Sequence, residues 1–138
     1  MGHKSDTKRQ MYADLMERYR YVVDHYSCAD QTEAYIKTIT SQAKRFYVNP
    51  RWAVQRLAPM FKGDMDALKG LSPNKRQMYE DLFKVVVKLS SKLEFQGKSL
   101  YWITQFAVLQ PAPRFYVDPP MMSKIYHTCK HEMRNGLE

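Results

Sequence analysis

Two pairs of basic residues stand at matching places, each near the start of a long helical pattern. Lys8 and Arg9 recur as Lys75 and Arg76, inside eight-residue stretches that are identical at seven positions. Positive charge in the first turn of a helix is slightly unfavourable against the helix dipole. Its presence in both stretches indicates either contact with phosphate groups or a solubilising cluster, and both interpretations stay open.

A second repeated motif combines arginine with tyrosine. Residues 45–50 read RFYVNP and residues 114–119 read RFYVDP, which match at five of six positions. In a short extended segment, alternate side chains point to opposite sides, so the arginine and the tyrosine share the outward side. One interpretation is that arginine holds a phosphate while tyrosine stacks or donates a hydrogen bond. The residues concerned are Arg45, Tyr47, Arg114 and Tyr116.

The other interpretation of this motif is structural, and it is the one we favour. Asp14 and Asp81 are also present at matching places in the two upstream stretches. An ion pair between Arg45 and Asp14, and another between Arg114 and Asp81, would fix the extended segment to the long helix.

Residue patterns typical of catalysis or metal binding are weak. His127 and His131 are four residues apart on an expected helix, but no third ligand is evident, so we expect no metal. We find no serine–histidine–acid order, no pair of carboxylates with a plausible pocket, no CxxC and no glycine loop for phosphates. We therefore expect neither an enzyme nor a cofactor.

The motifs recur in the same order, at offsets of 67 and 69 residues, which predicts a tandem duplication. Each repeat starts with apolar residues spaced by 4, 4, 3 and 4, which predicts a helix of about five turns. A shorter helix, the extended motif and a third helix follow. The stripes are Met11, Leu15, Tyr19, Val22 and Tyr26 in the first repeat, and Met78, Leu82, Val86, Leu89 and Leu93 in the second.

Residues that favour helix ends lie between these patterns. Serine, aspartate and asparagine accept hydrogen bonds from the first free backbone N–H groups of a helix, and proline suits the first helical position. Asp30 and Glu33 have the spacing of a capping box, and Gly97 is typical of a helix end. The other expected caps are Ser5, Ser72, Ser99, Asn49 before Pro50, and Asp118 before Pro119.

The sequence thus predicts an all-α protein made from two three-helix units. We place the first unit at residues 5–62, a linker at 63–71 and the second unit at 72–135. Each third helix follows a short extended corner flanked by proline. Units of this size are marginally stable alone, so we expect them to pack through their long helices as one compact body.

Three helices with the third presented after a corner resemble the helix-turn-helix class of DNA-binding proteins. The resemblance covers residues 8–60 and 75–133 and is one of architecture. It implies that the third helix enters the major groove with its N-terminal residues near base edges. The alternative is a solvated helix face. The residues that the resemblance points to are Arg51 and Gln55, and then Ser123, Lys124 and His127.

Charge also favours an anionic partner, with nucleic acid first. The chain has 138 residues and a net charge of +8, and each half contributes +4. A basic balance of this kind attracts nucleic acids. No apolar run is long enough to cross a membrane, and no signal peptide is evident. The two cysteines, Cys28 and Cys129, stand at non-equivalent places, which fits a reducing cytoplasm better than a disulfide framework.

These patterns together predict a small protein that binds duplex DNA. Its basic first turns would contact phosphates and its third helices would contact bases or a groove, as in a regulatory or mobile-element accessory factor. A protein–protein adaptor is the alternative. In that case an aromatic and methionine-rich groove would receive a partner helix.

Overall fold

Helices make up most of the computed structural model, which describes residues 6–64 and 66–134. An all-α fold was expected, and the described residues contain no strand beyond a single pair of bridging residues. The elements are α1 (Asp6–His25), α2 (Gln31–Ile39), α3 (Pro50–Phe61), α4 (Pro73–Ser90), the short 3-10 helix η1 (Leu93–Phe95), α5 (Leu100–Ala107) and α6 (Pro119–Arg134).

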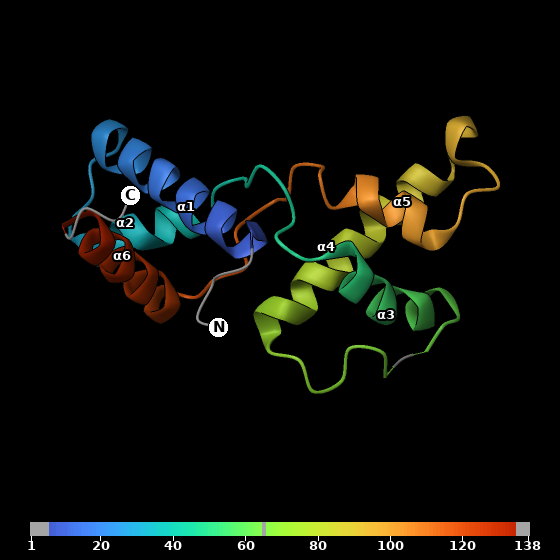
Figure 1. Ribbon diagram of the computed structural model, residues 1–138. Coiled ribbons are helices and arrows are strands. Elements are labelled where there is room, and N and C mark those ends of the chain that lie inside the picture. Colours follow the sequence, from blue (N-terminus) through green and yellow to red (C-terminus); the bar gives the residue numbers. More distant parts are fainter. Residues whose placement is uncertain (1–5, 65, 135–138) are drawn as a thin grey trace.

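The six α-helices pack as two lobes of three (Figure 1). One lobe contains α1, α2 and α6, and the other contains α3, α4 and α5. The third helix of each sequence repeat therefore packs on the first two helices of the other repeat. The chain crosses between the lobes twice, through residues 40–49 and 108–118.

This packing divides the chain differently from the expected ranges 5–62 and 72–135. Residues 63–71, expected to link two units, join α3 to α4 inside one lobe. The long helices α1 and α4 were expected to hold the units together, but the extensive contacts among the described helices do not include this pair. An extended segment advances by roughly 3.3 Å per residue, so each corner carries the chain to the other lobe instead of turning it back.

The two crossing segments pair with each other as short antiparallel strands do. Ala43 N–H donates to the Ala112 carbonyl at 2.9 Å, and Ala112 N–H donates back at 3.0 Å. On either side, Phe46 N–H donates to Val108 and Phe115 N–H donates to Ile39. These bonds join the lobes. Both motifs lie outside the helices, but they are not extended throughout, because Arg45 and Arg114 lie at bends and the N–H groups of Val48 and Val117 donate to the carbonyls two residues earlier.

Aromatic side chains fill the space between the crossing segments. Phe46 and Phe115 are buried, as expected from their inward positions. Phe46 stacks on Tyr116 with ring centroids 6.2 Å apart, and Tyr47 stacks on Phe115 at 5.9 Å. Each phenylalanine thus packs on the tyrosine of the opposite motif, which fixes the two segments side by side.

The expected helix caps are present wherever the structure describes them. Asp30 accepts a hydrogen bond from the Glu33 N–H at 2.9 Å, while the Glu33 carboxylate accepts one from Ala29 N–H at 2.7 Å. Ser5, and the end of the second expected unit at residue 135, lie outside the described residues. The other caps join Ser72 to Lys75, Ser99 to Trp102, Asn49 to Arg51 and Asp118 to Met121.

The apolar stripes predicted for the two long helices face the core except at their last positions. Leu15 and Val22 on α1, and the stripe of α4 through Leu89, are buried. Tyr26 and Leu93, expected to continue the stripes, lie beyond the ends of α1 and α4 and are exposed. Gly97, with φ of +78°, closes the turn after η1 and does not end α4.

Two further observations concern the chain as a whole. In the described part of the chain, no helix has both the length and the apolar character needed to cross a lipid bilayer. No disulfide joins Cys28 and Cys129 in the described part of the chain.

Candidate nucleic-acid interface

The N-terminal ends of α1, α3, α4 and α6 all face the middle of the molecule, and their C-terminal ends face outward (Figure 1). α3 and α6 begin directly after the crossing segments. The repeated arginines tie the crossing segments to the starts of α1 and α4. The Arg45 guanidinium donates to the Gln10 amide oxygen of α1 at 3.4 Å, and the Arg114 guanidinium donates to the Asn74 amide oxygen of α4 at 3.5 Å. The N-terminal end of a helix carries partial positive charge and the C-terminal end partial negative charge. α2 and α5 end at the start of the crossing segments, so four N-terminal ends lie at the middle against two C-terminal ends, and the balance favours anions.

The basic first turns reinforce this potential. Lys8 and Arg9 on α1, and Lys75 and Arg76 on α4, are all exposed. Lys8 lies 5.9 Å from the ring of Tyr12. Among the described residues, no carboxylate forms an ion pair with Arg9, Lys75 or Arg76. Their charges are therefore directed to solvent or to an anionic partner.

The expected third-helix residues lie in two separate places. Arg51 and Gln55 are exposed on α3, in one lobe, while Lys124 and His127 are exposed on α6, in the other. Ser123 is half-buried on α6. The structure therefore does not gather these five residues into one site, and a ligand that touched both groups would have to span the two lobes.

The repeated tyrosines form the contact that we expected of the arginines. Tyr47 Oη donates to Asp14 Oδ2 at 2.5 Å, and Tyr116 Oη donates to Asp81 Oδ2 at 2.6 Å. The expected Arg45–Asp14 and Arg114–Asp81 ion pairs are wrong, because the tyrosine of the same motif occupies each carboxylate. Burial, together with the carboxylate partner, raises the pKa of Tyr47 and of Tyr116, so both hydroxyls remain protonated donors at neutral pH.

The arginines instead lie against neutral groups. Arg45 Nε donates to the Phe46 carbonyl at 3.1 Å, while Arg114 Nε is buried and has no hydrogen-bond partner. The guanidinium carbons lie 5.9 and 6.0 Å from the ring centroids of Tyr47 and Tyr116. Both arginines are half-buried, and each is positioned without a carboxylate in an ion pair.

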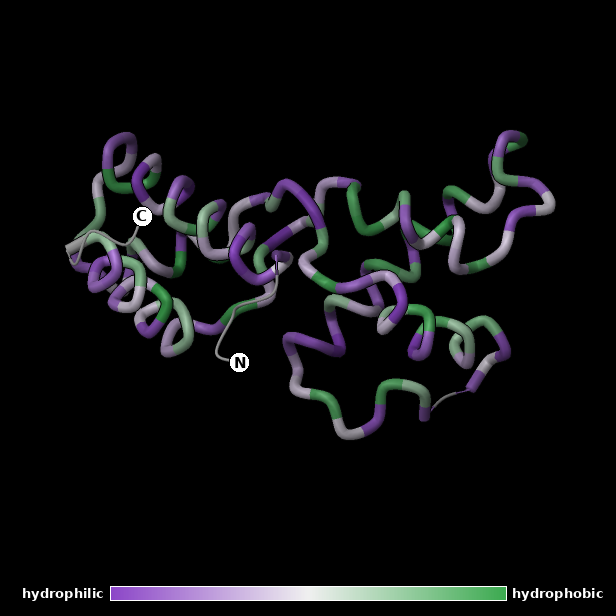
Figure 2. The backbone as a smooth tube through the Cα atoms, in the orientation of Figure 1, coloured by the Kyte–Doolittle hydropathy of each residue, from purple (hydrophilic) through white to green (hydrophobic). Residues whose placement is uncertain are grey.

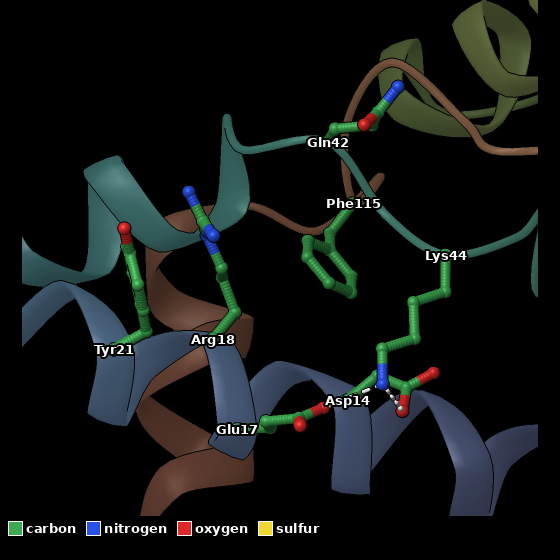
Figure 3. Close-up of a pocket in the computed structure, with 7 residues that line it drawn as sticks. All are labelled: Asp14, Glu17, Arg18, Tyr21, Gln42, Lys44 and Phe115. Carbon is green, nitrogen blue, oxygen red and sulfur yellow. Dashed lines mark hydrogen bonds and ion pairs between the residues drawn. The ribbon is translucent and has the colours of Figure 1, made fainter.

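One further cation, Lys44, lies in the first crossing segment but is already neutralised (Figure 3). Its ammonium group is 2.7 Å from Glu17 and 3.8 Å from Asp14, at a hollow of about 290 Å³ that Phe115 also lines. The hydrogen bond with Lys44 lowers the pKa of Glu17, and Glu17 in turn raises the pKa of Lys44. Both groups are charged at neutral pH, so Lys44 is occupied within the protein.

Comparison with known proteins gives no independent guide. No protein-family model, curated protein or solved structure matches this chain.

Among the residues that the structure describes, no three histidine, cysteine, aspartate or glutamate side chains gather in a way that could hold a metal ion. Function must therefore be inferred from the geometry and charge of the surface.

A surface that the sequence patterns did not reveal lies on α5. Tyr101, Trp102 and Phe106 are exposed there. A signal was present in the sequence, because six of the eight residues of LYWITQFA are apolar or aromatic, more than one buried face needs. Such a helix is usually enclosed by protein, which α5 is not.

The tyrosine–aspartate bonds give a direct test of this junction. We expect Tyr116→Phe to lower the free energy of unfolding by about 1–3 kcal/mol, because half-buried Asp81 then retains only the Gln77 amide at 2.9 Å. Tyr47→Phe should cost less, since Asp14 keeps Lys44. Urea denaturation measures both, with exposed Tyr101→Phe as the control. A Tyr116→Phe protein that unfolds at the wild-type urea concentration would contradict this role.

Proposed function

We propose that the protein binds duplex DNA, with the phosphates held at the middle of the molecule. The observation that carries this proposal is the orientation of α1, α3, α4 and α6, whose N-terminal ends converge there, with basic side chains in the first turns of α1, α3 and α4. Backbone N–H groups and helix dipoles at such ends favour phosphate. Third-helix residues would then contact bases or a groove on either side, consistent with a regulatory or mobile-element accessory factor.

The contacts divide into two kinds. Arg9, Lys75 and Arg76 lack carboxylate partners and would neutralise phosphates without reading sequence. Arg51, Gln55, Lys124 and His127 carry donors suited to base edges or phosphates. Ser123, being half-buried, would contribute less. Arg45 and Arg114 are held at the junction by neutral partners, and their charges would add to the attraction.

The two lobes also suggest how the protein arose. We infer a tandem duplication in which the third helices were exchanged between the repeats. The support is that equivalent contacts occur twice, as in the bond from Phe46 to Val108 and the bond from Phe115 to Ile39, both shifted by 69 residues. An exchange of this kind binds two small units into one stable body.

Salt dependence tests DNA binding. We expect a random duplex to bind, and the logarithm of its affinity to fall against the logarithm of salt concentration with a slope of about −4 to −7. Fluorescence anisotropy with a labelled duplex, from about 50 mM salt upward, measures the slope. No binding at the lowest salt, or affinity that does not change with salt, would rule out the proposal.

Two charge-matched variants locate the contact. The first replaces four basic residues near the middle, and the second replaces four basic residues elsewhere. Because both lose the same charge, a general electrostatic effect would weaken DNA binding equally. We expect the first to reduce the steepness of the salt slope by about three to four and the second by less than one. The first set is Arg9, Lys75, Arg76 and Lys124, and the second is Arg20, Lys84, Lys88 and Lys92, all changed to alanine.

A protein–protein adaptor is the second candidate function. The observation that favours it is the exposed apolar surface of α5, because large exposed apolar patches mark interaction sites. This role does not exclude DNA binding, since the exposed residues Tyr101, Trp102 and Phe106 are not among those proposed to contact DNA.

A further inference from the structure

The outer face of α5 exposes more apolar surface than a solvated helix needs. Tyr101, Trp102, Phe106 and Leu109 are exposed by 41%, 45%, 43% and 58%, and Leu93 of the neighbouring η1 by 88%. Figure 2 shows hydrophobic residues along much of this helix. Single exposed apolar residues are ordinary, but a group on one helix face indicates a surface that another molecule covers.

The other repeat shows that this position in the fold does not require an apolar face. At an offset of 69 residues, three α5 positions and Leu109, just beyond the end of α5, correspond to polar residues of α2 and to its C-cap residue Thr40. Two of these, Glu33 and Lys37, form an ion pair at 3.7 Å across one helical turn. The outer face of the helix in this position can therefore be polar, and the aromatic residues on this face of α5 are specific to the second lobe. The equivalents of Tyr101, Trp102, Phe106 and Leu109 are Thr32, Glu33, Lys37 and Thr40.

A groove lies beside this face, between α3, α4 and α5. It has a volume of about 370 Å³, and buried Val86 and Ile103 lie among the residues that line it. Phe61 and Leu100 add apolar surface, and the exposed lysines Lys62 and Lys98 line it as well. A hollow of this size receives one or two apolar side chains of a partner.

The charges around the surface select the partner. Between residues 91 and 109 the basic residues are Lys92 and Lys98, and the acidic one is Glu94. Lys98 lies against Trp102, and Lys62 and Lys98 line the groove, so the charge closest to the apolar face is positive. An acidic partner complements this arrangement, whereas a second copy of the chain would bring the same lysines and repel.

The ring geometry argues against single-stranded nucleic acid. Bases stack on open aromatic faces. Here Trp102 and Phe106 are tilted by 54°, Phe95 meets Phe106 edge-on at 74°, and the Lys98 ammonium lies 5.2 Å from the centroid of the Trp102 ring. The rings pack against one another, and together they form a continuous apolar surface of the kind that receives aliphatic side chains.

We propose that the outer face of α5 and the adjoining groove dock an acidic amphipathic helix of a partner protein. Its apolar residues, spaced as i, i+3, i+4 and i+7, would lie on Trp102 and Phe106 and enter the groove. Its carboxylates would meet Lys62, Lys92 and Lys98. The site rests on the second candidate function and does not depend on DNA binding.

The probe is a synthetic 18-residue peptide with leucine at those spacings and glutamate at most other positions. Its amphipathic order is compared with a scrambled peptide of the same composition and with a version in which lysine replaces glutamate. NMR of the labelled full chain reports the site, because the indole signal of Trp102 should shift while that of Trp52, at the start of α3, should not. We expect the ordered acidic peptide to bind at least tenfold more tightly than either control.

The decisive variant carries the residues of α2 on α5. Trp102→Glu with Phe106→Lys recreates the Glu33–Lys37 pair on an exposed face and should leave the fold intact. We expect it to weaken peptide binding at least tenfold. The variant's affinity for duplex DNA should depend on salt as that of the wild type does. The docking proposal can therefore fail while DNA binding is intact, and the reverse. Ile36→Lys, an exposed change on α2, should change neither.

Several results would overturn the proposal. These are equal binding of the scrambled or lysine peptide, shifts confined to other residues, and unchanged peptide binding by the α5 variant. Binding of oligodeoxythymidine or of anionic phosphatidylserine vesicles at this face, without binding of the peptide, would assign it to a different ligand. A wild-type dimer that the α5 variant converts to a monomer would assign it to a second copy of the chain.

Discussion

Replacing Phe46 with alanine should lower the free energy of unfolding by about 3–5 kcal/mol. The Phe46 side chain is fully buried between the lobes and stacks on Tyr116, and its own backbone N–H bonds Val108. Truncation would remove this contact area and leave a cavity at the point where the crossing segments meet. Urea denaturation, followed by circular dichroism, measures the change.

The control for this prediction is another large aromatic residue. Trp52 is 63% exposed at the start of α3, so Trp52→Ala should change stability by less than about 1 kcal/mol. The loss at Phe46 would be a large fraction of the total stability of a typical domain, which is about 5–15 kcal/mol. Equal effects of the two substitutions would show that the junction is not packed as described.

Cutting the chain within residues 63–71 should leave two fragments that depend on each other. Each lobe takes two helices from one side of this segment and one helix from the other. Fragments 1–69 and 70–138 should therefore be largely unfolded alone, because α1 and α2 lack α6 and α4 and α5 lack α3. Mixed, they should regain helix and elute as a one-to-one complex. Circular dichroism and size-exclusion chromatography with light scattering measure both properties.

The two separate three-helix units predicted from the sequence, at residues 5–62 and 72–135, would give the opposite result in this experiment. If the third helix of each repeat packed within that repeat, both fragments would fold as monomers and would not need one another. A Phe115→Ala change in the second fragment provides the internal control. It should weaken the complex, because Phe115 is buried on Tyr47 and bonds Ile39, both from the first fragment.

Local features of this fold were predictable from the sequence. The caps at Asp30, Ser72 and Ser99 depend on side chains and backbone groups only three residues apart, so their chemistry is visible in the chain. The apolar stripes also identified buried residues such as Leu15 and Leu82, because helical periodicity is itself a local property.

Parts of the candidate interface were predictable and parts were not. The sequence placed Lys8, Arg9, Lys75 and Arg76 in first turns, and the structure describes all four there and exposed. It did not indicate that the N-terminal ends of four helices converge, because that depends on the path of the crossing segments. The Asp14 and Asp81 partners were misassigned for a similar reason. Arginine and tyrosine are two residues apart in the motif, and only tertiary packing decides which one reaches the carboxylate.

The tertiary structure alone decided which helices share a lobe. Two similar repeats offer each third helix two similar surfaces, so the apolar residues of α3 and α6 suit either partner and leave the choice open. The direction of the extended corner makes that choice, and it is fixed by the bonds between Ala43 and Ala112 and by the packing of Phe46 and Phe115. These contacts join residues about 70 positions apart. The sequence by itself therefore determined the helices and most of their caps, while long-range packing determined which third helix joins each lobe and left the outer face of α5 exposed.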